Sequence, residues 1–202
     1  MIRALIFDVG GVLLRTEDLA GRRKWEARFG MADWELADLV FNSPVALAAT
    51  LGQAPESDVW EHVRVRLKLS DGELSELRED FWSGDRLDES LLDWIAARRG
   101  PYRTCILSNA WSGARKFLAG RPGVAAAFEE MVISAEEGLM KPQVEIYRRA
   151  LERVDVAPAE AVFVDDVLAN VQAAQAVGLA VIHYQPGLDV PRAMKALGVQ
   201  AG

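Results

Sequence analysis

The sequence has little cysteine, no long apolar run and no repeated or low-complexity segment. Its single cysteine, Cys105, excludes an internal disulfide bond and is typical of a reducing compartment. Because Cys105 lies in the apolar run 104–107 with no positive group adjoining it, we expect a buried side chain and not a nucleophile. No apolar run reaches the roughly 18 residues of a membrane-spanning helix, and no leader-like segment precedes the first strand-like run. These absences predict a cytoplasmic protein.

An excess of positive charge is also missing. The 202 residues include 23 lysines and arginines against 30 aspartates and glutamates, a net charge of −7. This balance excludes the basic surface of a typical nucleic-acid-binding protein, and we expect neither nucleic acid nor a membrane as partner. An acidic protein can still bind phosphate where positive charge is local and a metal ion assists. The length allows one substantial core and a small accessory domain.

Several short apolar runs end in polar residues, as buried parallel strands do when they deliver side chains at their carboxyl ends. They comprise residues 3–8, 103–109, 161–166 and 179–184, with a weaker one at 131–134. They alternate with helical patterns at residues 87–99, 142–154 and 167–177. This alternation predicts an α/β fold with a doubly wound parallel sheet. Since such sheets bind ligands beyond the carboxyl ends of their strands, we expect the polar strand ends to meet there.

One long segment interrupts the alternation. Residues 15–86 contain no convincing strand but several amphipathic stretches rich in aromatic residues. We therefore predict an α/β core built from residues 1–14 and 87–202, with residues 15–86 inserted as a small helical domain. Its tryptophans are expected to pack mainly in its own core, and the basic run 22–24 to form a solvated helix face.

Four short motifs follow one another along the chain. They read FDVGGVLL at 7–14, ILSN at 106–109, MKP at 140–142 and FVDDVLAN at 163–170. Each is weak alone, but their order is specific. Together they resemble the haloacid dehalogenase (HAD) superfamily, in its phosphatase branch with a helical cap after the first strand. The resemblance covers nearly the whole chain and implies a HAD-like, Rossmannoid core, a cap, and phosphomonoester hydrolysis through an aspartyl-phosphate intermediate.

The resemblance also implies roles for residues of the first three motifs. Asp8 would be the nucleophile, which can attack phosphorus once the negative charge of the substrate is offset. The Ser108 hydroxyl and a main-chain amide at Asn109 would bind the phosphoryl oxygens as charge spreads over them. Lys141 would reach back to the phosphate and to the Asp8 carboxylate, with Pro142 opening a helix beside it.

A magnesium ion is the implied cofactor. Mg²⁺ in proteins takes a few carboxylate oxygens together with water and phosphate. By resemblance, this partial shell would come from Asp8, the Gly10 carbonyl and the pair Asp165 and Asp166. Asp166 is the favoured direct ligand, and Asp165 would orient Lys141 or a metal-bound water.

The first motif departs from the phosphatase pattern at Gly10. Most phosphatases of the superfamily have a second aspartate there, which protonates the leaving oxygen and later activates water, worth about 10²–10⁴-fold in rate. Three explanations are open: a substrate with a good leaving group, a cap residue or metal-bound water as substitute, or a slow or non-catalytic protein. Some similar sugar-phosphate phosphatases carry glycine there, so we favour the first explanation and a sugar phosphate as substrate. His183, at a strand end, is an alternative proton donor, although a packed or surface histidine is more common.

Two other functions compete with a magnesium-dependent phosphatase acting on a small phosphorylated metabolite. Haloacid dehalogenases proper also lack the second aspartate, and they need no metal ion. They lack the carboxylate pair of the fourth motif, however, so Asp165 and Asp166 favour phosphate chemistry. The second alternative is a catalytically weak protein that binds a phosphorylated ligand.

Overall fold

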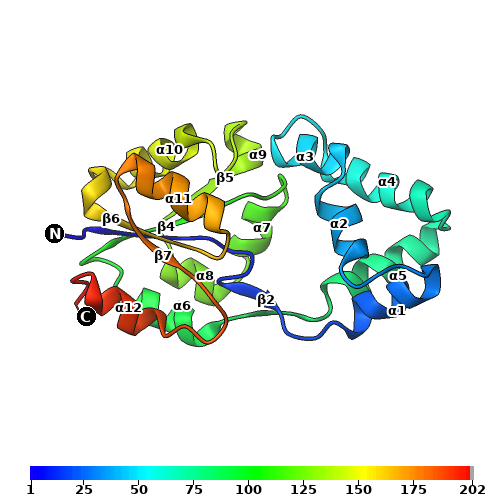
Figure 1. Ribbon diagram of the computed structural model, residues 1–202, viewed down its shortest axis with the longest axis horizontal. Helices are drawn as coiled ribbons and strands as arrows, with labels where there is room; N and C mark the ends of the chain where they lie inside the picture. The colour runs from blue at the N-terminus through cyan, green and yellow to red at the C-terminus, as the bar shows by residue number, and fades with distance from the viewer. Residues whose placement is uncertain (201–202) are drawn as a thin grey trace.

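A five-stranded parallel sheet forms the centre of the computed structural model, which describes residues 1–200 (Figure 1). The strand order is β5-β4-β1-β6-β7, and all four pairings are parallel. The strands are β1 (Ala4–Phe7), β4 (Arg103–Ser108), β5 (Glu130–Ile133), β6 (Ala161–Asp165) and β7 (Ala180–His183). The central β1 is buried along its whole length, because it has a strand on either side and helices above and below.

Helices cover both faces of this sheet. Successive side chains of a strand point to opposite faces, so Leu5 and Phe7 pack in one hydrophobic cluster while Ala4 and Ile6 pack in another. The first cluster includes side chains of α6 (Glu89–Ala96), α7 (Ala114–Ala119), α8 (Pro122–Ala127) and α12 (Val190–Ala196). The second includes side chains of α10 (Val144–Val154) and α11 (Leu168–Val177). The predicted α/β fold with a doubly wound parallel sheet is confirmed.

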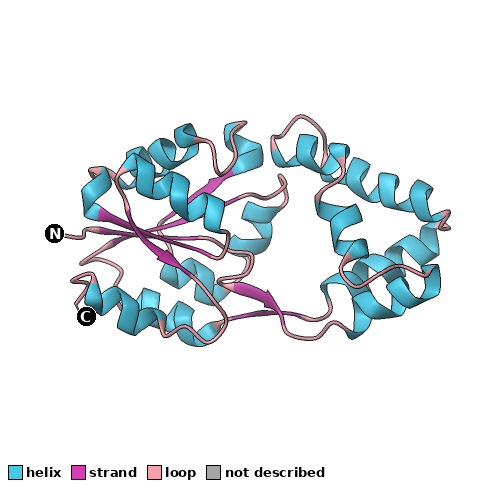
Figure 2. Cartoon of the chain, in the orientation of Figure 1, coloured by secondary structure: helices cyan, strands magenta, loops and turns pink. Residues whose placement is uncertain are grey.

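Between β1 and β4 the chain leaves the sheet through a two-stranded antiparallel ribbon. The ribbon pairs β2 (Leu14–Thr16) with β3 (Asp85–Leu87). Five helices lie between its two strands: α1 (Ala20–Phe29), α2 (Glu35–Phe41), α3 (Pro44–Thr50), α4 (Glu56–Leu67) and α5 (Asp71–Trp82). We call these helices the helical unit, and Figures 1 and 2 show it beside the α/β core.

The helical unit has its own hydrophobic cluster, which includes Trp25, Trp60 and Phe81. Local sequence signals begin its helices, because the first N–H groups of a helix need acceptors outside it. Ser43 accepts a hydrogen bond from the first turn of α3, and Ser70 forms a capping box with Glu73 at the start of α5.

Three local expectations were wrong. The edges of the inserted segment do contain strands, β2 and β3, each only three residues long. Arg22 is buried and does not belong to a solvated helix face. Pro142 is not the first residue of α10, which begins at Val144, and the Lys141–Pro142 peptide bond is cis.

Two short helical elements remain. The single turn α9 (Ser134–Glu137) follows β5, and the short 3₁₀-helix η1 (Pro158–Glu160) precedes β6. Across residues 1–200, no helix combines the length and the apolar character needed to cross a bilayer.

Candidate active site

The carboxyl ends of neighbouring strands bring three of the four motifs together, and the third motif, with Lys141, lies between α9 and α10. Asp8 follows β1, and its main-chain N–H donates to the carbonyl of Val164 in β6 (2.9 Å). Asn109 follows β4, on the other side of β1. Because all these strands are parallel, their ends share one edge of the sheet, as expected for a ligand site in this class of fold.

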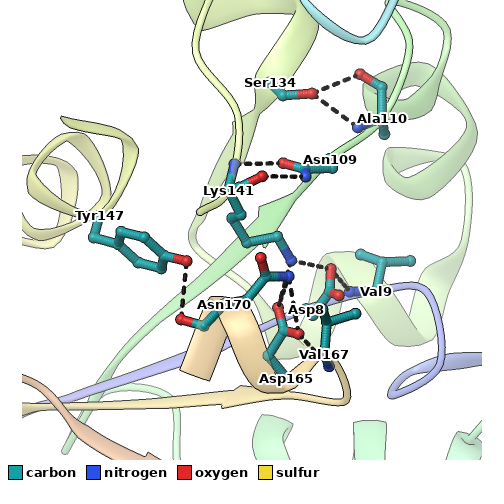
Figure 3. Close-up of polar contacts among 10 residues, drawn as sticks. All are labelled: Asp8, Val9, Asn109, Ala110, Ser134, Lys141, Tyr147, Asp165, Val167 and Asn170. Atoms are coloured by element: carbon teal, nitrogen blue, oxygen red, sulfur yellow. Dashed lines mark hydrogen bonds and ion pairs between the residues drawn. The ribbon is translucent and has the colours of Figure 1, made fainter. Parts of the chain in front are cut away.

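Lys141 lies at the centre of this edge, between two carboxylates (Figure 3). Its Nζ is 2.7 Å from Oδ1 of Asp8 and 2.7 Å from Oδ2 of Asp165. The three side chains are 1 %, 10 % and 0 % exposed, so little water screens their charges. One ammonium group thus faces two carboxylates, which leaves the cluster with a negative charge that a cation would offset.

The excess negative charge affects the proton affinity of Asp8. Burial raises the pKa of Asp8 to about 7, because a carboxylate loses its hydration there; attraction to Lys141 acts in the opposite direction, and repulsion from Asp165 adds to the rise. The main-chain N–H of Val9 and the Lys141 ammonium both bind Oδ1 of Asp8. Both contacts therefore fall on one oxygen of this carboxylate, and none of them on Oδ2.

Asp165 is held from several directions. Its Oδ1 accepts a hydrogen bond from the N–H of Val167 (2.7 Å), and the Asn170 amide lies 3.1 Å from both of its oxygens. Tyr147 in turn donates to the carbonyl of Asn170 (3.0 Å), which fixes the start of α11 (Figure 3). With both oxygens engaged, Asp165 is suited to orient Lys141.

Asp166 completes a group of carboxylates. Asp8, Asp165 and Asp166 each offer an oxygen within 4.8 Å of the others. Burial, and then repulsion from Asp165, raises the pKa of Asp166. Gly11 makes room for this side chain, since a Cβ atom there would lie 2.1 Å from Oδ2 of Asp166, and its φ of +75° also favours glycine. Hard oxygen donors of this kind suit Mg²⁺.

The second motif lies beside Lys141. Ser108 ends β4 and is buried. The Asn109 side chain makes two hydrogen bonds with the main chain of Lys141, accepting from its N–H (2.8 Å) and donating to its carbonyl (2.9 Å). This side chain therefore holds the lysine segment.

Two supporting residues were missed or misjudged from the sequence. The Ser134 hydroxyl binds both the N–H (2.9 Å) and the carbonyl (3.2 Å) of Ala110, and so fixes the loop after Asn109. The only hint of this role was a serine at the end of a weak strand. His183 has Nε2 2.9 Å from the carbonyl of Asp166. It is therefore placed to hold that loop, which argues against a free proton donor.

Gly10 stands where the sequence departs from the phosphatase pattern. A Cβ atom built there meets nothing within 4 Å, and its φ is outside the left-handed region. Neither crowding nor backbone strain therefore demands glycine at this position.

Known proteins resemble this chain to different extents. The chain is 24 % identical to a D-ribitol-5-phosphate phosphatase of Bacteroides thetaiotaomicron, over 94 % of this chain and 95 % of that protein. It is 46 % identical to the sesquiterpene phosphatase astK of Aspergillus oryzae over 61 residues, which are 30 % of this chain and only 31 % of that relative. A HAD family enzyme of B. thetaiotaomicron, solved with magnesium and inorganic phosphate, superposes with a TM-score of 0.79 at 21 % identity, over 96 % and 99 % of the two chains.

The family itself is shown by a match along most of the sequence. Residues 2–178 match the haloacid dehalogenase-like hydrolases. This range includes every motif residue of the site described above, from Asp8 to Asn170. The chain therefore belongs to the haloacid dehalogenase-like hydrolase family.

Proposed function

We propose that this hydrolase is a magnesium-dependent phosphatase that cleaves a small phosphomonoester through an aspartyl phosphate on Asp8. The observation that carries the proposal is the group of three carboxylates, Asp8, Asp165 and Asp166, within 4.8 Å of one another beside Lys141. A metal-independent dehalogenase has no use for such a group. The full-length similarity to a ribitol-phosphate phosphatase supports the same choice.

In the first step, Oδ2 of Asp8 attacks phosphorus in line with the leaving oxygen. The Oδ2–P bond forms as the bond from phosphorus to the leaving oxygen breaks, and the leaving oxygen takes up a proton from solvent water to become the alcohol. Lys141 offsets the charge of the phosphoryl group, while the Ser108 hydroxyl and the Asn109 N–H hold its oxygens. Water then attacks the phosphorus of the aspartyl phosphate, which releases phosphate and regenerates the Asp8 carboxylate.

Asp8 and Asp166 are the residues best placed to hold Mg²⁺, together with the main-chain carbonyl of Gly10. Asp165 adds its negative charge and fixes Lys141, since its oxygens already accept hydrogen bonds. When bound, the ion would neutralise negative charge on the substrate and allow two anionic groups to approach. Both carboxylates must lose their protons to bind it, against the raised pKa of each.

The helical unit is proposed to act as a cap. In this division the core comprises residues 1–14 and 87–202 and the cap residues 15–86, with substrate binding between them. Closure of the cap would exclude water during the first step. Since Gly10 cannot protonate the leaving oxygen, we expect substrates with good leaving groups to react fastest. A sugar phosphate with its ester at the anomeric carbon meets that requirement, because its leaving oxygen is less basic than that of a simple alcohol.

Phosphate release from a panel of sugar phosphates, alkyl phosphates and acyl phosphates tests the proposal, with and without EDTA. We expect release that needs Mg²⁺ and is lost in Asp8→Asn. Halide release from 2-chloropropionate in the presence of EDTA would instead establish a dehalogenase. A folded protein that binds phosphate but turns over none of the panel would also refute the proposal.

A further inference from the structure

We infer that three aromatic side chains, Phe41, Trp82 and Trp111, form a wall that binds the organic group of the substrate and selects phosphomonoesters with an apolar group. This aromatic wall is assigned as the specificity-determining part of the site, and the inference rests on the proposed phosphatase function. It differs from the sugar-phosphate expectation drawn from Gly10 alone.

The wall consists of rings in mutual contact. The ring centroid of Phe41 lies 5.8 Å from that of Trp82 and 5.8 Å from that of Trp111. Behind them stands Trp60, which is buried and lies 6.4 Å from Trp82 and 6.2 Å from Trp111. Such edge and tilted contacts hold each ring in place. The wall is therefore a supported apolar surface.

Part of this surface is open to solvent. Phe41 is 39 % exposed and Trp82 is 38 % exposed, although both touch the hydrophobic cluster of the helical unit. Single exposed apolar residues are common in proteins. Two adjacent half-exposed rings on a buried aromatic base are different, because together they present a continuous apolar face that an organic group can cover.

Trp111 links the wall to the phosphate end of the site along the chain. Trp111 is the third residue after Ser108, in the loop that Asn109 and Ser134 fix, yet it is buried in the hydrophobic cluster of the helical unit. Trp82 ends α5, directly before the ribbon that returns to the core. Figure 1 shows α2, which Phe41 ends, on the side of the helical unit that faces the core. A phosphoryl group beside Lys141 would thus place its organic group near these rings.

The chemistry of the wall favours hydrocarbon or aryl groups over polyols. Covering apolar rings with an apolar group removes both surfaces from water, which favours binding in proportion to the area covered. A polyol pressed against the same rings would lose hydrogen bonds to water without replacement. The indole N–H of Trp60, at the base of the wall, already donates to Glu56 (3.2 Å).

The test compares hexyl phosphate with a hexitol 6-phosphate, using the full chain with Mg²⁺. Both are primary esters on six carbons. The hydroxyl groups make the leaving oxygen of the hexitol somewhat less basic, which works against the expected preference and makes the test stricter. We expect kcat/KM for hexyl phosphate to exceed that for the hexitol phosphate by about tenfold or more, the size typical of apolar pockets. Phe41→Ala and Trp82→Ala should each lower this ratio several-fold, while Phe41→Leu, which keeps an apolar side chain, should retain most of it.

Trp34→Ala is the matched control. Trp34 precedes the same helix, is 56 % exposed and makes none of the ring contacts of the wall, so its variant should keep the wild-type ratio. Circular dichroism melts identify any variant that fails to fold. If either Phe41→Ala or Trp82→Ala fails to fold, the other variant still provides the test. Two results would overturn this inference and leave the phosphatase proposal intact. One is a higher kcat/KM of the wild type for the hexitol phosphate, and the other is an equal loss of kcat/KM on both substrates in Phe41→Ala and Trp82→Ala. No phosphate release even from acetyl phosphate would overturn the phosphatase proposal as well.

Discussion

A buried cation lies in each region of the molecule, Arg22 in the helical unit and Lys141 in the α/β core, but the two are balanced differently. Arg22 has one carboxylate partner, Asp85 (3.1 Å), donates to the carbonyl of Phe81 (2.9 Å) and lies 4.2 Å from the centroid of that ring. Lys141 faces two carboxylates at 2.7 Å each. The first arrangement pairs one cation with one carboxylate at contact distance, with the buried Glu26 as a further neighbouring charge, whereas the second places one cation between two carboxylates and beside a third.

This difference separates a structural ion pair, that of Arg22, from the ion pairs of Lys141, which we propose to be functional. Arg22 joins α1 to the end of α5 and to β3, so it fixes the helical unit at the ribbon. A neutral buried pair costs desolvation and adds little net stability, but losing one partner is expensive because the other charge remains buried. A cluster with unbalanced charge is typical of a functional site, where a ligand, a cation or a proton balances it.

The largest expected effect comes from replacing one carboxylate partner of each buried cation, Asp8 beside Lys141 and Asp85 beside Arg22. Asp8→Asn removes the proposed nucleophile, so we expect phosphate release to fall by at least about 10⁴-fold. It also leaves Lys141 with one carboxylate, so at pH 8 the free energy of unfolding of the metal-free protein should rise. Asp85→Asn is the control, and because it leaves Arg22 buried without its partner, it should lower that free energy. Urea unfolding that shows both variants equally destabilised would contradict the comparison.

The next effect concerns the cations themselves. Arg22→Met should lower the free energy of unfolding by about 3 kcal/mol, because the Asp85 carboxylate stays buried without its partner. Turnover per folded molecule should remain close to wild type, whereas Lys141→Met should abolish turnover. Denaturant melts and phosphate release on the same samples separate the two outcomes. Loss of turnover in folded Arg22→Met would show that Arg22 acts on the substrate.

The same comparison explains what the sequence could predict. The core strands and the residues at their ends were predictable, because apolar runs that end in Asp8, Asn109 or Asp166 combine local pattern with parallel-sheet geometry. The carboxylate group was predictable from the motifs for the same reason.

The features that were missed depend on partners far along the chain. Arg22 lies in a basic run that reads as solvated, and only its pairing with Asp85, 63 residues later, explains its burial. The strands β2 and β3 are too short and too polar to show a pattern alone. The Asn109 side chain binds main-chain groups of Lys141, which no residue-type signal reveals.

Gly10→Asp gives the third prediction and tests the missing acid–base group. The open space around Gly10 and its ordinary φ should allow the substitution without a loss of stability. We expect turnover of alkyl phosphates, which are poor leaving groups, to rise by about 10²-fold. Turnover of acetyl phosphate, whose leaving group needs no proton, should hardly change. Equal effects on both substrates, measured as kcat at saturating Mg²⁺, would count against the leaving-group explanation.

The smallest expected effect is the pH dependence of magnesium binding. The pKa of Asp8 in the folded protein is raised from 3.8 to about 7, so the metal-free native state binds a proton more tightly than the unfolded chain. Its stability should therefore fall as pH rises from about 4 to about 7. Mg²⁺ competes with this proton, so its apparent affinity should drop about tenfold from pH 8 to pH 6.

Thermal melts with increasing Mg²⁺ at pH 6 and pH 8 measure this difference. The shift in Tm at a fixed, subsaturating Mg²⁺ concentration should be larger at pH 8, and Asp8→Asn should remove most of the pH dependence. Asp85→Asn, which alters the neutral pair at the ribbon, should leave the pH dependence as in the wild type. If the Mg²⁺-induced shift were the same at both pH values in the wild type, the proton on Asp8 would not compete with the ion. A group other than Mg²⁺ or the Asp8 proton would then balance the negative charge around Lys141. The difference in charge between the Lys141 and Arg22 surroundings would then no longer indicate a metal site.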